Sequence, residues 1–212
     1  MSVIGITGGI ASGKSSLTDR LSQLLKAEVF DADATARELV QSDSGVRLLL
    51  QERFGPSAFC ADGSVDREWL RERVFADESK RRALEEILHP AIRARWTAKA
   101  GAFRASGTGQ TAEWLLLDIP LLYEVGAESQ CDAVVVVACR EETQVERIVA
   151  RRGLSPEMAR KMIASQTSLA SKAARAEYVV WNDAPLERLD EQAELFAGYL
   201  IRNALWMNNL PR

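Results

Sequence analysis

The chain has 212 residues, of which 47% are hydrophobic and 27% charged, and its formal net charge is −3. This length predicts a single domain with room for an inserted subdomain. The composition is typical of a globular protein with a buried core, and it excludes a largely disordered chain. The small acidic excess argues against a nucleic-acid-binding protein, because such proteins usually carry a basic surplus.

Cysteine and histidine are scarce: the chain has Cys60, Cys131, Cys139 and one histidine, His89. The odd count and the wide spacing argue against a disulfide framework and against a Cys-x-x-Cys metal or redox site. Pro90 follows His89, which favours a structural role for this histidine. No apolar run reaches the roughly 18–20 residues of a membrane span, and the N-terminus lacks a signal-peptide pattern. We therefore expect a cytoplasmic protein with no membrane partner.

Short apolar runs alternate with amphipathic segments along the chain, which predicts an α/β fold with a mainly parallel sheet. The predicted strands and helices are, in chain order, strand 3–7, helix 14–26, strand 27–30, strand 114–118, strand 132–138, helix 141–152, helix 155–166 with Ser155 as its N-cap, strand 178–181 and helix 185–206. Residues 34–100 are almost entirely helical in pattern, with Asp66 as an N-cap, and the glycines between Gly101 and Thr111 indicate a loop. The two helical insertions should lie at the carboxyl ends of the strands, where ligands bind in open α/β sheets.

Residues Gly8–Ser15 match the phosphate-binding pattern Gly-x4-Gly-Lys-[Ser/Thr] between a predicted strand and a predicted helix, which is the context that this motif requires. The glycines let backbone N–H groups wrap a phosphate, and the following helix points its positive end at the same group. We expect Lys14 on the β and γ phosphates of ATP and the Ser15 hydroxyl on Mg²⁺. The predicted nucleotide-binding residues of this P-loop are Gly8, Gly9, Ile10, Ala11, Ser12, Gly13, Lys14, Ser15 and Ser16.

Two carboxylates, Asp31 and Asp33, end the second predicted strand. Residues two apart in an extended chain face the same way, so both can face the crevice beside the P-loop. A carboxylate there can hold Mg²⁺ through water, the role we assign to Asp31, or accept the proton of an attacking hydroxyl late in phosphoryl transfer. Alternatively, Asp33 caps a helix that begins near Ala34. The spacing alone leaves both roles of Asp33 open.

Further charged residues have two interpretations each. Arg147 and Arg151, one turn apart after the fourth strand, are either lid arginines that neutralise a transferred phosphoryl group or part of a solvated face. Asp118, at the end of the third strand, either orders Mg²⁺ or simply ends that strand. The Lys and Arg residues of 64–100 form a mostly solvated helix surface, of which a minority could face a phosphate-bearing acceptor.

Several segments together resemble the dephospho-CoA kinase family over about residues 3–190. They are Ile6–Ser15, Asp31-Ala32-Asp33 with Ala36-Arg37, Leu88-His89-Pro90, Asp118–Glu124, Gln144, Arg147, Arg151, Gln166, Lys172, Ala174-Arg175-Ala176 and Asn182. The P-loop alone would match many families. The Asp-x-Asp-x-x-Ala-Arg run, the Leu-His-Pro run and the Pro-Leu-Leu-x-Glu run make the resemblance specific.

The resemblance implies an enzyme that uses ATP and Mg²⁺ to phosphorylate the ribose 3′-hydroxyl of 3′-dephospho-CoA, the last step of coenzyme A biosynthesis. It implies that Asp33 is the general base, that Lys14, Arg147 and Arg151 are catalytic, and that Asn182 contacts the nucleotide. The lone departure inside the P-loop is Ala11, where the family commonly has glycine. Trp181-Asn182-Asp183-Ala184 stands where the family usually has Asp-Asn-Ser/Asn-Gly, which puts the adenine-side contacts in question.

The implied architecture is a single P-loop kinase domain with a five-stranded, mainly parallel sheet flanked by helices. Its expected parts are a core (about 1–33, 112–140 and 176–212), a helical acceptor-binding insertion (about 34–111) and a short helical lid (about 141–175). We expect a monomer or a weak homo-oligomer. The alternatives are a kinase of another small acceptor, such as a nucleoside monophosphate, shikimate or gluconate, and a nucleotide-dependent switch without kinase activity.

Overall fold

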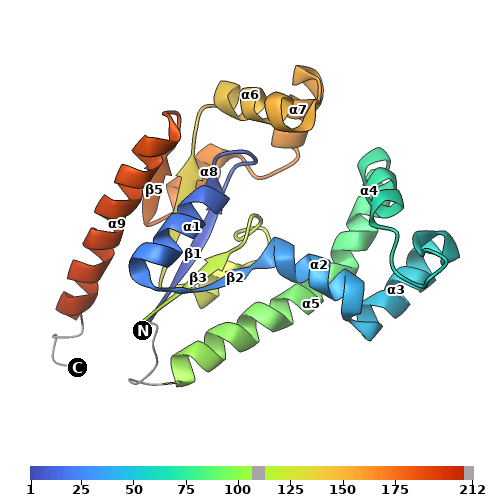
Figure 1. Cartoon of the computed structure of the whole chain (residues 1–212), viewed down its shortest axis with the longest axis horizontal. Helices are drawn as coiled ribbons and strands as arrows, with labels where there is room; N and C mark the ends of the chain where they lie inside the picture. The colour runs from blue at the N-terminus through green and yellow to red at the C-terminus, as the bar shows by residue number, and fades with distance from the viewer. Residues whose placement is uncertain (107–112, 208–212) are drawn as a thin grey trace. The chain divides into compact units, whose positions relative to one another are not determined.

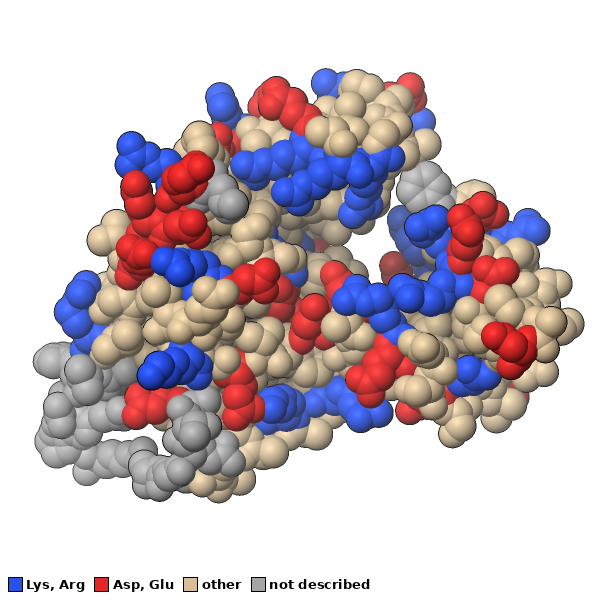
Figure 2. Space-filling view, viewed as in Figure 1, with Lys and Arg blue, Asp and Glu red and all other residues tan. Residues whose placement is uncertain are grey.

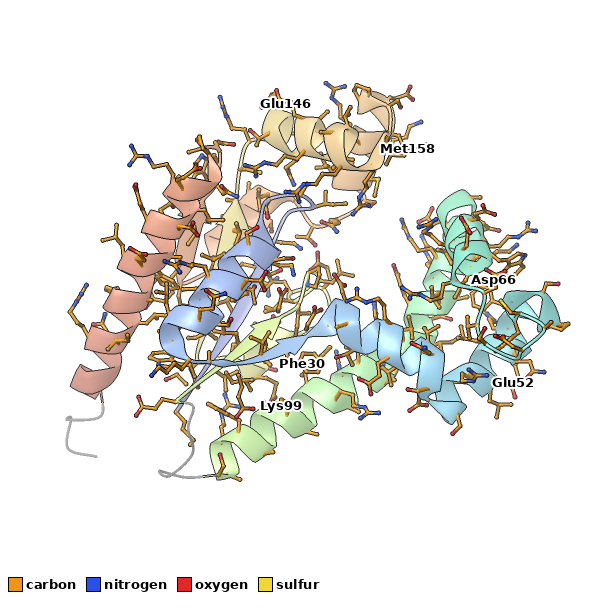
Figure 3. The ribbon with its side chains drawn as sticks, viewed as in Figure 1. Phe30, Glu52, Asp66, Lys99, Glu146 and Met158 are labelled. Carbon is orange, nitrogen blue, oxygen red and sulfur yellow. The ribbon has the colours of Figure 1, made fainter. Side chains whose placement is uncertain are left out.

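The structure is a computed structural model that describes residues 1–106 and 113–207. It divides into two compact units, Met1–Phe30 with Ala100–Arg212 and Asp31–Lys99. The chain passes from one unit to the other at Phe30 and again at Lys99, both labelled in Figure 3.

The first unit contains a five-stranded parallel sheet in the order β2-β3-β1-β4-β5, which confirms the predicted fold class. Its strands are β1 (Ser2–Gly8), β2 (Glu28–Asp31), β3 (Trp114–Asp118), β4 (Ala133–Ala138) and β5 (Tyr178–Trp181). β1 is the central strand and pairs in parallel with β3 and β4. Its apolar run is buried throughout, as expected for a parallel strand that is covered on both faces.

Several helices of the first unit flank the sheet or lie beyond its carboxyl edge (Figure 1). They are α1 (Lys14–Leu25), the short η2 (Ala127–Gln130), α6 (Glu141–Arg152), α7 (Pro156–Ala164), α8 (Leu169–Arg175) and α9 (Leu186–Met207). α1 and α9 lie side by side on one face of the sheet (Figure 1). Leu17 and Leu21 of α1 and Leu189 of α9 are buried against Ile6 of β1. Each fully buried leucine contributes about 1.5–3 kcal/mol to the hydrophobic stabilisation that holds the helix on the sheet.

α6 and α7 form a packed helical pair after β4, where the sequence predicted a lid (Figure 1). Ser155 caps α7 as predicted, with its hydroxyl oxygen accepting a hydrogen bond from Met158 N at 3.2 Å. A small apolar cluster, Val145, Ile148 and Ala159, joins the two helices and packs against Ile10 and Ala11 of the P-loop. The helical pair is therefore in contact with the phosphate-binding loop.

The second unit is helical, as the charge-rich pattern of residues 34–100 predicted. Its elements are α2 (Ala32–Ser42), α3 (Ser44–Phe54), the short η1 (Pro56–Ala58), α4 (Arg67–Ala76) and most of α5 (Glu78–Ala105). Asp66 caps α4 as predicted, and Pro90 lies inside α5. Leu39, Leu50 and Trp96 are among its buried apolar side chains.

Three local predictions were wrong or incomplete. The helix after β2 begins at Ala32 rather than Ala34, so only Asp31 belongs to the strand, and Asp31 and Asp33 do not share one face of an extended chain. Residues 101–105 of the predicted loop are the last turn of α5, and 107–111 lie outside the described residues. α8 was not predicted at all. Within the described ranges, no helix is both long enough and apolar enough to cross a membrane.

Candidate functional site

The P-loop joins the carboxyl end of β1 to the first turn of α1. Gly13 is the N-cap of α1, with φ of 96°, and provides no side-chain hydrogen bond to the helix. The first N–H groups of a helix lack intrahelical partners, so those of Lys14 and Ser15 are available to a phosphate. The positive end of the helix dipole favours an anion at the same place. The predicted phosphate site therefore has the required backbone geometry.

Three P-loop glycines are packed so closely that a side chain would collide. A Cβ atom on Gly8 would lie 2.5 Å from the Val137 carbonyl oxygen, and one on Gly9 would lie 2.3 Å from Gln144 Nε2. A Cβ atom on Gly13 would lie 2.2 Å from Asn182 Nδ2. Gly8 is therefore required by the backbone beside it, whereas a side chain at Gly9 or Gly13 would displace the amide ends of Gln144 and Asn182.

Two amide side chains hold the outer side of the P-loop. Gln144 of α6 donates from Nε2 to the Ile10 carbonyl oxygen at 2.6 Å. Asn182, buried just after β5, donates from Nδ2 to the Ser12 carbonyl oxygen at 2.8 Å. Asn182 was predicted to contact the nucleotide, and the structure shows that its amide supports the loop that would do so.

The ammonium group of Lys14 forms an ion pair with Oδ1 of Asp118, the last residue of β3. Thr18, one turn further along α1, donates from its hydroxyl to Asp118 Oδ2 at 2.9 Å. Asp118 is buried, so its charge acts over a short distance in a poorly screened environment. Both predicted roles of Asp118, ordering Mg²⁺ or simply ending the strand, stay predictions; the structure adds a contact through which Asp118 orients the P-loop lysine.

The two candidate lid arginines differ in their surroundings. Arg147 is half-buried, and its Nη1 donates to the carbonyl oxygens of Ala11 and Ser12, at 3.4 Å each. Arg151 lies one turn further along α6 and is exposed. Figure 2 shows lysine and arginine side chains gathered over α6 and α7, whose positions Glu146 and Met158 mark in Figure 3. The structure thus brings Arg147 to the P-loop and leaves Arg151 at the exposed surface of α6.

The carboxylates predicted for the acceptor side belong to the second unit. Asp31 caps α2, with Oδ1 accepting a hydrogen bond from Ala34 N at 2.8 Å. The capping role proposed as the alternative for Asp33 therefore belongs to Asp31. Asp33 lies exposed in the first turn of α2, where the helix dipole favours a negative charge. Its carboxylate is free of the cap and accessible from solvent.

The donor set fits a magnesium ion bound mainly through a nucleotide. Among the described residues, no group of three or more His, Cys, Asp or Glu side chains could hold a metal ion by itself. Mg²⁺ in nucleotide sites usually keeps several waters and takes few protein ligands besides phosphate oxygens. The exposed Ser15 hydroxyl, at the positive end of α1, suits that arrangement.

One group of contacts was not predicted from the sequence. Asp183 accepts hydrogen bonds from Arg140 N at 2.9 Å, from Arg140 Nε at 3.2 Å and from Trp181 Nε1 at 2.6 Å. Burial raises the pKa of Asp183, but hydrogen bonds from Thr143 and Arg140 outweigh it, so the pKa lies below its usual value. Trp181 and Asp183, two of the three departures from the family pattern in this segment, thus bond each other and hold Arg140 at the start of α6.

A second unpredicted group surrounds Lys172, which is completely buried in α8. Its ammonium group bonds to Glu124 Oε1 at 3.0 Å and to the Pro120 carbonyl oxygen at 2.9 Å. The signal that could have found this pair was the Pro-Leu-Leu-x-Glu run, which contains Glu124. Nothing in the local sequence linked Glu124 to a lysine 48 positions later.

Sequence comparisons give the chain close relatives. A family model described as dephospho-CoA kinase matches residues 2–188. A dephospho-CoA kinase of Syntrophotalea carbinolica is 40% identical over 205 residues, which cover 95% of this chain and 93% of that protein. One of Symbiobacterium thermophilum is 44% identical over 194 residues, covering 92% and 79%.

Solved structures with the same fold include a Thermus thermophilus protein that is 32% identical, with a TM-score of 0.72 and coverage of 94% of this chain and 97% of that one. A dephospho-CoA kinase from Campylobacter jejuni is 22% identical, with a TM-score of 0.69 and coverage of 95% and 98%. A shikimate kinase from Bacteroides thetaiotaomicron is 15% identical, with a TM-score of 0.53 and the same coverage. At these last two identities the likeness shows a common fold alone.

Proposed function

This chain belongs to the dephospho-CoA kinase family, and from that premise we propose how its residues carry out the family's reaction. In that reaction the γ-phosphoryl group of ATP passes to the ribose 3′-hydroxyl of 3′-dephospho-CoA, which gives coenzyme A and ADP. The observation that carries the proposal for this chain is the structure of the P-loop. Gln144 and Asn182 donate hydrogen bonds to its carbonyl oxygens, and Asp118 orients its lysine through an ion pair.

We assign the P-loop to ATP. Residues 8–16 hold the phosphates through their available backbone N–H groups. The carbonyl oxygens of Ile10, Ala11 and Ser12 accept hydrogen bonds from side chains outside the loop. Lys14 binds the β and γ phosphates, and Asp118 keeps its side chain directed toward them. The Ser15 hydroxyl would hold Mg²⁺, and Asp31 would hold it through water. When bound, that ion neutralises charge on the phosphate oxygens.

We assign the helical segment of about 34–111 to the acceptor and residues 141–175 to the lid. Asp33 orients the ribose 3′-hydroxyl and accepts its proton late in the transfer, because a free carboxylate is too weak a base to remove that proton in advance. Arg147 and Arg151 neutralise charge that develops on the transferred group. A cytoplasmic location and a monomeric or weakly oligomeric state complete the proposal.

The reaction is tested by measuring ADP formation from Mg·ATP with dephospho-CoA, in parallel with AMP, shikimate, gluconate and no acceptor. We expect strong stimulation by dephospho-CoA alone, with coenzyme A as the product. Equal slow hydrolysis under every condition would remove the kinase activity and favour a nucleotide switch. Stimulation by one of the other acceptors would identify a different small-molecule kinase.

The role of Asp33 is tested by Asp33→Asn. We expect kcat to fall by about 100-fold or more, the usual contribution of a positioned general base, while ATP binding measured by calorimetry is retained. Glu38→Gln provides a matched control, because Glu38 is another exposed carboxylate of α2. Turnover by Asp33→Asn at the level of Glu38→Gln would show that Asp33 is not the base.

A further inference from the structure

Lys172 carries a charge that is shielded from solvent on every side. Its side chain is 0% exposed, although α8 is only 7 residues long. Moving an ammonium group out of water is strongly unfavourable unless the group is paired and hydrogen-bonded. Lys172 meets that condition through Glu124 Oε1 and the Pro120 carbonyl oxygen, at 3.0 and 2.9 Å.

The Pro120 carbonyl oxygen receives a second hydrogen bond, from the hydroxyl of the buried Thr7 at 2.9 Å. Thr7 directly precedes the P-loop, and Pro120 lies two residues after Asp118. One oxygen atom therefore links three segments: the end of β1, the end of β3 and α8. Through Asp118 this connection extends to the ammonium group of Lys14.

Glu124 connects the same group to the lid. Besides Lys172, its Oε1 accepts a hydrogen bond from Thr167 N at 3.3 Å, between α7 and α8. Burial raises the pKa of Glu124, but the hydrogen bond and charge of Lys172 outweigh it, so the pKa lies below its usual value. Glu124 is therefore ionised at neutral pH and holds the end of the lid by a charged contact.

We propose that Lys172 and Glu124 are positioning residues for phosphoryl transfer, an inference that rests on the proposed function. The pair fixes the end of the lid to the carboxyl end of β3, and so fixes the lid arginines relative to Lys14. The pair acts on the reaction through those residues and does not itself touch the phosphates. Small displacements of catalytic groups reduce turnover far more than they reduce substrate binding.

A purely structural role makes a different prediction. Replacing a buried ion pair by uncharged side chains of similar volume often leaves stability unchanged or improves it. A positioning role requires turnover to fall even where stability is retained. The two roles are distinguished by measuring kcat and the KM for ATP separately and comparing both with the unfolding temperature.

The test uses Lys172→Met, Glu124→Gln and the double variant, with Lys161→Met as the control. Lys161 is an exposed lid lysine paired with Glu157 at 2.9 Å, so its variant also removes one lysine and one ion pair. Each purified protein is assayed for kcat and KM for both substrates and for its unfolding temperature.

We expect Lys172→Met and Glu124→Gln to lower kcat by about 10- to 100-fold, the usual effect of losing a residue that orients catalytic groups. The KM for ATP should stay within about threefold, and the double variant should be no worse than the more impaired single variant, because the two residues act as one unit. Lys161→Met should keep kcat within about twofold.

Three results would overturn the inference: kcat within about twofold of wild type in both single variants, additive losses in the double variant, or losses that merely follow the folded fraction. If Lys172→Met does not fold, Glu124→Gln decides alone, because Glu124 is partly exposed, so its variant is expected to fold while removing the charge of the pair. The proposed function fails separately, and only if the wild-type protein does not phosphorylate dephospho-CoA.

Discussion

Lys14 and Asp118 form an ion pair that joins the first turn of α1 to the end of β3. The pair lies at the edge of the sheet where β1 ends, and Thr18 occupies the second carboxylate oxygen. Both charges are largely buried, with side-chain exposures of 14% for Lys14 and 7% for Asp118. Removing one partner would therefore leave the other charge unpaired in a buried position, and the pair also directs the lysine that the proposed mechanism requires.

Asp118→Asn should destabilise the protein because Lys14 would lose its charged partner in a buried position. We expect the free energy of unfolding to fall by about 1–3 kcal/mol. For a protein of this size each kcal/mol lowers Tm by about 2–4 °C, so we expect Tm to fall by roughly 2–12 °C. Asp190→Asn is the control, since Asp190 is half exposed and lies 3.8 Å from Arg20. Equal unfolding temperatures for the two variants would contradict the importance of the pair.

The same substitution should have opposite effects at two glycines. Gly13→Ala introduces a Cβ at φ of 96° and 2.2 Å from Asn182 Nδ2, so we expect a loss of about 2 kcal/mol or more and loss of ATP binding. Gly101→Ala lies inside α5 with open space around the new Cβ, so we expect a gain of about 0.5–1 kcal/mol. Chemical denaturation measures the change in the free energy of unfolding for each variant. A harmless Gly13→Ala would show that the P-loop does not need this backbone conformation.

Asn182→Asp tests whether the P-loop is supported from outside. The carboxylate cannot donate to the Ser12 carbonyl oxygen and would repel it, which should distort the loop. We expect the KM for ATP to rise by about tenfold, which corresponds to about 1.4 kcal/mol, while the KM for dephospho-CoA changes little. Asn203→Asp, at a partly exposed position of α9, is the matched control and should leave both constants unchanged. An unchanged KM for ATP in Asn182→Asp would refute the supporting role.

The three cysteines should differ sharply in reactivity. Burial raises the pKa of the Cys131 thiol to about 12 and that of Cys139 to about 11, so both are protonated at pH 8, whereas Cys60 is exposed. Since the thiolate is the reactive form, a thiol reagent at pH 8 should modify one cysteine rapidly in the native protein and three after unfolding. Cys60→Ser should abolish the rapid phase. A rapid phase that survives this change would show that a buried thiol is accessible.

Local signals made much of the fold predictable. The strands Trp114–Asp118 and Tyr178–Trp181 have the predicted bounds, because short runs of apolar residues that include aromatic side chains favour buried strands. The helix Glu141–Arg152 also has the predicted bounds and ends at Gly153, whose φ of 64° suits a helix terminus.

The remaining features depend on contacts between distant segments. The chain offers Asp31 and Asp33 as possible helix caps, and only the path of β2 decides which of them is used. Lys172 lies in a short polar segment and is of a residue type that is usually exposed. Periodicity therefore predicts neither the helix α8 nor the burial of Lys172. The support of the P-loop by Asn182 joins residues 170 positions apart, and no local pattern encodes it.

The position of β1 also has a consequence for the order in which the protein can fold on the ribosome. β1 is synthesised before β3 and β4, yet Ser2 pairs with Trp114 and Ile4 pairs with Ala133. At roughly 5–20 residues per second, the partners of β1 emerge many seconds after it. Until β3 and β4 have been synthesised, the apolar side chains of β1 have no strand to pair with and stay exposed. The nascent chain is therefore open to aggregation through this segment during that time. The nucleotide site, which begins where β1 ends, can form only after β3, β4 and Asn182 have been synthesised.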